Sequence, residues 1–123
     1  MIRFAPATPD DDSQLRALLR ENGMASWVTM AVEREPSFFA GMNRFGVDHA
    51  VIARDGDRAV GMFVRSDHPV HWNGHPARTG YLGALRIDAA YRRRVGALRE
   101  GYRAAFAAGD ASGSGFCYTC VAS

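Results

Sequence analysis

The chain contains no lysine, and all 15 of its basic residues are arginine. A compositional bias of the source genome is the plain explanation. An arginine-only set of basic residues is compatible with anion binding, because the planar guanidinium makes bidentate contacts with phosphates. The formal net charge is only +2, which gives too small a basic surface for us to expect a nucleic-acid partner.

Other absences narrow the class of protein further. No apolar run is long enough to cross a bilayer, and the N-terminus lacks the apolar segment of a signal peptide. We therefore expect no membrane partner and a cytoplasmic location, where the two cysteines would stay reduced. No internal repeat is visible. A length of 123 residues with 47% apolar residues predicts one globular domain, residues 1–123.

The apolar spacing and the turn signals predict a mixed α/β fold. A helix is expected to start at Thr8-Pro9, with acidic residues after it, and to end at Asn22-Gly23. Gly83-Ala84 lies inside a predicted strand and indicates a bulge or a close backbone approach. The predicted strands cover 1–8, 48–54, 59–66, 79–88 and 116–122, further helices cover 38–45 and 91–108, 24–35 is a helix or a loop, 67–78 is a loop or a hairpin tip, and 109–115 is a loop.

The segment 85–98 carries the clearest chemical signal, since a strand leads into a basic turn and then into a helix. The first turn of a helix has free N–H groups and attracts anions. Arg92, Arg93 and Arg94 add positive charge there, and Gly96 and Ala97 allow a bulky phosphate to approach. The alternative is a solvated basic turn that binds nothing, although three arginines there oppose the helix dipole unless an anion is bound.

This segment resembles the acetyl-CoA motif of the GNAT acyltransferases, in which a strand ending in Leu-x-Val-x-Pro is followed by Tyr-Arg-Gly-x-Gly-x-Gly/Ala. Residues 85–88 match the strand end, Tyr91-Arg92 match the turn, and residues 94–97 fall in the pyrophosphate loop. The order of elements also matches the family through its fifth strand. Ala89 replaces the usual Pro, and Arg93 and Val95 replace two Gly. A second register, starting at Arg93, is also compatible.

The resemblance implies a GNAT-like fold with a mixed central sheet flanked by helices, its C-terminal part missing or supplied by another segment. It implies transfer of an acetyl or other acyl group from acetyl-CoA to an amine of a small molecule or peptide, without a metal. Backbone groups of Leu85 and Ile87 would pair with the pantetheine arm, and an N–H near Ile87 would hold the oxyanion. The implied cofactor-binding residues are Leu85, Arg86, Ile87, Arg92, Arg93, Arg94, Val95, Gly96 and Ala97.

The catalytic residues stay unassigned. The family often places a carboxylate in the strand before the turn, but residues 81–87 contain none. Tyr81 and Tyr118 could reach the cleft or could be ordinary core or rim aromatics. The usual Tyr acid lies on a helix after the fifth strand, beyond this chain. A non-catalytic ligand-binding or regulatory module on the same fold is therefore the alternative function.

Four weaker patterns complete the predictions. Cys117 and Cys120 are expected to be buried strand cysteines rather than a redox or metal pair. The loop histidines are expected at the rim of a cleft rather than at a zinc site; they are His68, His71 and His75. An apolar wall is expected to line the acceptor pocket, to cover the sheet or to make a homodimer contact; it comprises Met24, Trp27, Met30, Phe38 and Phe39. A last strand at the chain end also predicts that the native chain continues or that a second molecule completes the sheet.

Overall fold

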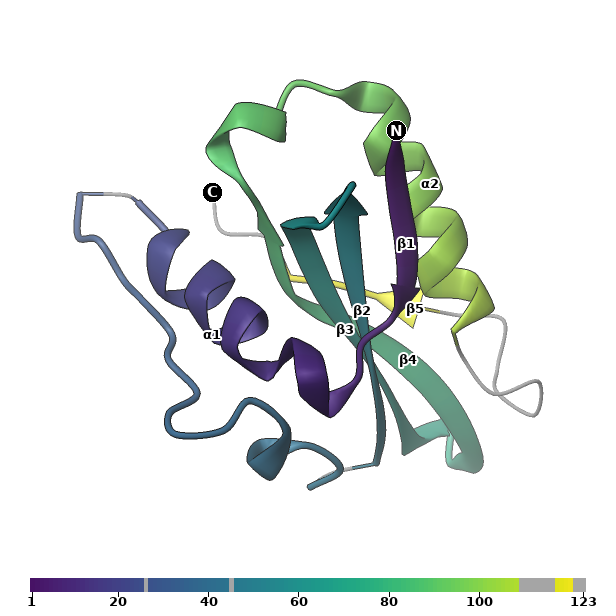
Figure 1. Ribbon diagram of the computed structural model, residues 1–123. Coiled ribbons are helices and arrows are strands. Elements are labelled where there is room, and N and C mark those ends of the chain that lie inside the picture. The colour runs from purple at the N-terminus through teal and green to yellow at the C-terminus, as the bar shows by residue number, and fades with distance from the viewer. Residues whose placement is uncertain (26, 45, 109–116, 121–123) are drawn as a thin grey trace.

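The computed structural model describes residues 1–25, 27–44, 46–108 and 117–120, and it contains one five-stranded sheet in the order β1-β2-β3-β4-β5 (Figure 1). The first four strands are antiparallel neighbours, and β5 runs parallel to β4. The main elements are β1 Ile2–Pro6, α1 Asp12–Glu21, β2 Val47–Asp55, β3 Arg58–Trp72, β4 His75–Ile87, α2 Val95–Ala107 and β5 Cys117–Tyr118. The expected loop at 109–115 and most of the expected strand at 116–122 lie outside the described residues.

The first helix confirms the predicted start and end signals. A short 3-10 turn, η1 Pro9–Asp11, precedes α1, and the Thr8 N–H donates to the Asp11 carboxylate at 2.9 Å. This contact is one half of a capping box. At the other end the Asn22 N–H and side-chain amide both donate to the Leu18 carbonyl, at 3.2 and 3.0 Å. The helix therefore ends where the sequence places its last turn.

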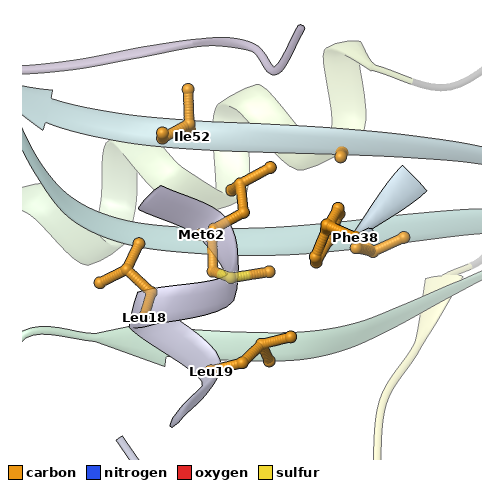
Figure 2. Packing of buried hydrophobic residues seen from close by; sticks show 8 residues of the cluster. Leu18, Leu19, Phe38, Ile52 and Met62 are labelled. Carbon is orange, nitrogen blue, oxygen red and sulfur yellow. The ribbon is translucent and has the colours of Figure 1, made fainter. Parts of the chain in front are cut away.

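The two helices cover opposite faces of the sheet, and each closes its own apolar cluster. The cluster under α1 contains eight buried residues (Figure 2); they are Leu15, Leu18, Leu19, Phe38, Ala50, Ile52, Met62 and Val64. The cluster under α2 is smaller and is built from Val51, Phe63 and Ala105, with Phe4 and Leu82 packed against it. Alternate residues of β2 and β3 serve the two clusters, as the two-residue period of a strand requires.

The segment between α1 and β2 differs from the prediction. The helix expected over 38–45 is wrong, because only one 3-10 turn forms there, η2 Phe39–Gly41. Phe38 is fully buried in the α1 cluster, so the chain is held at this point by packing rather than by helical hydrogen bonds. Met24 and Met30 form an isolated antiparallel bridge. The expected apolar wall is therefore divided, since Phe38 is core whereas Trp27 is 96% exposed.

The hairpin of β3 and β4 is longer than the predicted strands. The stretch 67–78, for which the sequence allows a loop or a hairpin tip, is paired from Asp67↔Gly80 out to Trp72↔His75. Asn73 and Gly74 make the turn with positive φ values of 47° and 82°. An Asn-Gly pair is the preferred sequence for such a two-residue hairpin turn. The tip therefore follows from its sequence, although the flanking residues show no alternating pattern.

The interior of β4 contains the bulge that Gly83-Ala84 predicts. The register against β3 shifts between Met62↔Arg86 and Val64↔Gly83, so two residues of β4 stand opposite Phe63 alone. Ala84 takes a φ of 53°, a left-handed conformation that costs an L-residue about 1–2 kcal/mol. The bulge lies directly before the segment expected to contact a cofactor.

Candidate functional site

One edge of β4 is left without a strand partner in the described part of the chain. β5 pairs with β4 only at Gly80↔Cys117 and Tyr81↔Tyr118. One residue further on, the Thr119 hydroxyl donates to the Leu82 carbonyl at 2.7 Å. Past this junction the edge of β4 that faces away from β3 has no ladder partner among residues 1–25, 27–44, 46–108 and 117–120. The junction is thus the closed end of a gap in the sheet.

The backbone of Leu85 and Ile87 faces this free edge. The Asp88 N–H donates to the Val60 carbonyl at 2.8 Å, so Asp88 faces β3. Because successive residues of a strand direct their backbone groups to opposite sides, Arg86 also faces β3, while Ile87 faces outward. The carbonyl of Leu85, a bulge residue, points opposite to the Arg86 N–H across their trans peptide bond, so it faces outward too. The structure thus directs the backbone groups of the two residues expected to pair with a pantetheine arm to the same edge.

Arginine side chains already hold the two outward carbonyls. Arg86 Nη1 donates to the Leu85 carbonyl at 2.8 Å, and Arg92 Nε donates to the Ile87 carbonyl at 3.2 Å. These contacts draw two side chains of the predicted set onto the edge of β4. The outward N–H group of Ile87 has no acceptor among the described residues, so this edge offers a donor to a ligand.

The turn that follows β4 is ordered by two carboxylates. Asp88 accepts from the Ala90 N–H at 2.9 Å and from Arg58 Nη2 at 2.7 Å. The hydrogen bond from the Ala90 N–H, and after it the one from Arg58, hold the pKa of the Asp88 carboxyl below its ordinary value. The short 3-10 turn η3 Ala89–Tyr91 starts on this cap. Asp55 likewise accepts from the Tyr91 hydroxyl at 2.9 Å, which lowers the pKa of Asp55 and raises that of Tyr91.

The three arginines of the turn precede the helix rather than forming its first turn. The helix expected over 91–108 begins only at Val95, with Arg94 as its N-cap residue. The Asp88 cap closes the η3 turn first, and arginine charges inside the first helical turn would oppose the dipole. Arg94 stacks over the Tyr91 ring at 4.5 Å, whereas exposed Arg93 has no hydrogen bond or ion pair among the described residues.

The N-terminus of α2 lacks a protein cap. Arg94 gives no side-chain cap, and the first turn holds no acidic residue. The Ala97 N–H donates to the Arg94 carbonyl at 3.0 Å, but the Gly96 N–H has no acceptor in the described part of the chain. A Cβ added at Gly96 would meet no atom within 4 Å. This helix end therefore offers a free donor, open space and nearby positive charge, as an anion site needs.

The departures from the expected glycine pattern leave the backbone of the turn unstrained. Among the described residues, positive φ values occur at Asn43, Gly56, Asn73, Gly74 and Ala84, all outside 88–97. The turn therefore has no position in the left-handed region, where a residue other than glycine would be strained. The side chain of Val95 lies outside what the structure describes.

A ring cluster forms at the β4–β5 junction. The rings of Tyr81 and Tyr118 lie 5.0 Å apart, and the Tyr118 hydroxyl lies 3.3 Å from Nε2 of His68. The sequence allows Tyr81 and Tyr118 at the cleft or in the core, and it places His68 at the rim of a cleft. His68 and Tyr118 are 50 residues apart and meet through the parallel pairing of β4 with β5, for which the sequence offers no local signal.

The remaining sequence patterns give these outcomes. Cys117 is half-buried and Cys120 is exposed, and both are free, so the prediction of two buried cysteines is wrong for Cys120. Within the residues that the structure describes, no group of three or more His, Cys, Asp or Glu side chains is arranged to hold a metal ion. None of the described helices is long and apolar enough to span a membrane.

The fold, unlike the sequence, has clear relatives. No protein-family model and no curated protein matches the chain. A transcriptional regulator from Bacillus halodurans C-125 aligns over 99% of this chain and 83% of its own, with a TM-score of 0.68 and 14% identity. An acetyltransferase from Trypanosoma brucei aligns over 99% of this chain and 84% of its own, with a TM-score of 0.61 and 15% identity.

A third solved structure includes the expected co-substrate. It is a predicted acetyltransferase from Clostridium acetobutylicum, solved with acetyl-CoA, and it aligns over 98% of this chain and 81% of its own, with a TM-score of 0.64 and 13% identity. At these identities the likeness establishes the fold and nothing finer. The chain has the mixed α/β fold of the GNAT acetyltransferases, as the motif at 85–97 predicts.

Proposed function

We propose that this protein is an N-acyltransferase that moves an acetyl group from acetyl-CoA to a primary amine of a small molecule or peptide. The observation that carries the proposal is the continuity of three features along one path. The free edge of β4 at Leu85 and Ile87 leads into the basic turn, and the turn leads into the uncapped start of α2. An anionic head with an extended amide arm matches this path in charge and in hydrogen-bonding groups.

The pyrophosphate is assigned to the start of α2. The Gly96 N–H and the positive end of the helix dipole supply the donors, and Arg93 is the free cation beside them in the described part of the chain. Gly96 leaves room for a phosphate to reach the backbone. Arg92 and Arg94 are already held, by Ile87 and Tyr91, and they set the shape and charge of the turn. This assignment uses the first register of the motif, in which residues 94–97 form the pyrophosphate loop.

The acyl end is assigned to the β4 edge. The pantetheine amides extend the sheet along Leu85 and Ile87, and an outward N–H polarises the thioester carbonyl and stabilises the developing oxyanion. The amine attacks the carbonyl carbon directly, and the thiolate of CoA leaves. Removing one such donor from an acyl-transfer site typically lowers the rate about 100-fold to 1,000-fold. A cytoplasmic location stays part of this proposal.

A second candidate is a module that binds an acyl-CoA without turning it over. The solved regulator from Bacillus halodurans with a TM-score of 0.68 favours it, since the same fold serves there in a protein described as a transcriptional regulator. Binding without release of free CoA, across a panel of primary amines, would identify this function. The panel comprises a polyamine, an aminoglycoside and a peptide with a free N-terminus.

The test is isothermal titration of acetyl-CoA into the chain and into the Gly96→Glu variant. The added side chain enters open space, so the fold should tolerate it. Its carboxylate would repel the pyrophosphate and occupy the helix donors. Losing one charge-assisted hydrogen bond costs about 1.5–3 kcal/mol, so we expect the dissociation constant to rise about 10-fold to 100-fold.

The matched control is Ala107→Glu, which adds the same charge to the same helix at its exposed far end. Its affinity for acetyl-CoA should stay within about threefold of the unmodified chain, as expected for a distant surface charge screened by salt. Equal losses in the two variants would mean that net charge rather than the turn governs binding. If the unmodified chain does not bind acetyl-CoA, the proposed function is rejected.

A further inference from the structure

The ring cluster at the β4–β5 junction lies on the sheet face that carries α1. Met62 and Val64 of β3 belong to the α1 cluster, and His68 follows them at an even spacing, so it shares their face. Tyr118 reaches His68 across the sheet, with its ring also against Tyr81. The α2 helix covers the other face through Ala105 and its neighbours. The cluster is therefore separated from α2 by the sheet itself.

The hydrogen bonds of His68 define which nitrogen can accept a proton. Its Nδ1 lies 3.3 Å from the Ser66 carbonyl, which can only accept, so Nδ1 carries the hydrogen in the neutral ring. Nε2 is then a free lone pair, and it faces the Tyr118 hydroxyl at 3.3 Å. The hydroxyl donates to Nε2 and keeps its own lone pairs available. Tyr118 is 47% exposed, so a solute can reach it.

The position of this pair matters because of the proposed function, on which the inference rests. The proposed acyl arm runs from the turn past Ile87 and Leu85 toward the junction, where Thr119 closes the gap at Leu82. Tyr118 is the residue immediately before Thr119. An amine that approaches the end of the arm from the α1 face therefore meets the Tyr118 hydroxyl.

We propose that Tyr118, backed by His68, is the proton acceptor for the amine. The acceptor arrives as an ammonium ion. One N–H bond breaks as its proton passes to the Tyr118 oxygen, while the Tyr118 proton passes to Nε2 of His68. The freed amine forms a bond to the thioester carbon, and the C–S bond breaks. The second proton lost by the nitrogen ends on the CoA thiolate, and His68 returns its proton to water.

The other ionisable groups near His68 do not offer this route. Asp48 of β2 shares the face, since it stands opposite Ser66, but its carboxylate accepts the Asn43 N–H at 3.0 Å. Asp67 points to the α2 face, where it pairs with Arg65 at 3.0 Å and lies 3.4 Å from Nε2 of His49. Tyr81, whose ring contacts that of Tyr118, is also a phenol and has no histidine behind it among the described residues. Tyr118 is thus the catalytic residue here, and His68 acts through it.

The test compares Tyr118→Phe, which keeps the ring against Tyr81, with Tyr102→Phe on the exposed side of α2. Acetyl transfer to the most reactive amine of the panel is measured between pH 5.5 and 9. General base catalysis contributes about 100-fold to 10,000-fold, so we expect kcat to fall at least about 100-fold in Tyr118→Phe. The affinity for acetyl-CoA should stay within about twofold. His68→Gln should also lower kcat while the affinity for acetyl-CoA stays within about twofold, because the Tyr118 hydroxyl then has no base to receive its proton.

Each outcome decides between the two proposals. Unchanged kcat in Tyr118→Phe, with turnover by the unmodified chain, overturns the proton-acceptor role alone. So does a fall of the same size in the Tyr102→Phe control, or a KM effect without a kcat effect. Failure of the unmodified chain to bind acetyl-CoA rejects the proposed function, and this role with it. An NMR finding that His68 carries its hydrogen on Nε2 would also overturn the role, whatever the activity.

Discussion

A buried ion pair between Arg65 and Asp67 gives the sharpest prediction about stability. Arg65 and Asp67 are only 4% and 2% exposed, and Arg65 Nε donates to Asp67 Oδ1 at 3.0 Å. Arg65 Nη1 also donates to the carbonyls of Ala105 and Phe106, at 2.9 and 3.0 Å. These carbonyls belong to the last turn of α2, which has no intrahelical donor for them. One guanidinium thus neutralises a buried carboxylate and caps a helix.

Replacing Arg65 by Met should destabilise the protein by about 3–5 kcal/mol, the usual cost of leaving one partner of a buried pair charged and alone. The double variant Arg65→Met, Asp67→Asn should be more stable than the Arg65 single variant, because it no longer buries an unpaired charge. It should still lose about 1–3 kcal/mol through the two helix carbonyls. Since the free energy of unfolding of a small domain is only about 5–15 kcal/mol, the Arg65→Met variant should be close to unfolding.

The assay is urea unfolding followed by far-ultraviolet circular dichroism. Tryptophan fluorescence would report poorly, because Trp27 is 96% and Trp72 is 50% exposed. A loss below about 1 kcal/mol in Arg65→Met would refute the account of a buried charge. A double variant at least as unstable as the single one would refute it too, since the two losses would then add instead of offsetting each other.

Three further changes test the sheet and the turn. In Gly80→Ala the new Cβ would lie 3.0 Å from both Arg65 Nε and Cys117 Sγ. We therefore expect the free energy of unfolding, measured in urea, to fall by about 1–3 kcal/mol. An unchanged free energy of unfolding would mean that the Arg65 and Cys117 side chains move aside freely. Ala84→Val should cost about 1–2 kcal/mol more than Ala84→Gly, because φ is 53° there; equal melting temperatures would contradict the strained bulge. The Asp88 carboxyl has a lowered pKa because of the Ala90 N–H and then Arg58, so its contribution to stability is present above the ordinary pKa of 3.8 and is lost as pH falls through the lowered value. Asp88→Asn should therefore lose less stability on acidification below about pH 4 than the unmodified chain, and identical acid curves would exclude the cap.

The sequence predicts the elements whose signals are local. The helix start at Thr8-Pro9 forms as predicted, and the hairpin tip over 67–78 and the bulge at Gly83-Ala84 are each one of the two alternatives that the sequence allows. All three depend on residues within a few positions. The helix expected over 38–45 fails because tertiary packing decides there: Phe38 is drawn into the α1 cluster. The start of α2 moves to Val95 because a carboxylate at Asp88 closes a different turn first.

The candidate site likewise has one part with a local sequence signal and one part that depends on tertiary structure. The turn residues are contiguous in sequence, so a sequence motif is enough to suggest them. The ring cluster cannot be found in this way, because His68 and Tyr118 come from β3 and β5 and meet only through the parallel register at Tyr81. The buried Arg65 and Asp67 carry no sequence signal either, since a charged pair two residues apart on a strand is usually solvated.

The glycines of this chain separate what the fold requires from what a ligand would require. At Gly80 a Cβ would lie 3.0–3.1 Å from side-chain atoms of Arg65, Cys117 and Asp67, so the fold itself disfavours a side chain there. At Gly96 no atom lies within 4 Å of the position of a Cβ. A glycine inside a helix destabilises it by up to about 1 kcal/mol relative to alanine. Packing does not require the glycine here, because a Cβ would fit without contact. Close approach of a phosphate to the Gly96 N–H supplies a reason, so Gly96→Ala should stabilise the free protein and weaken its binding of acetyl-CoA.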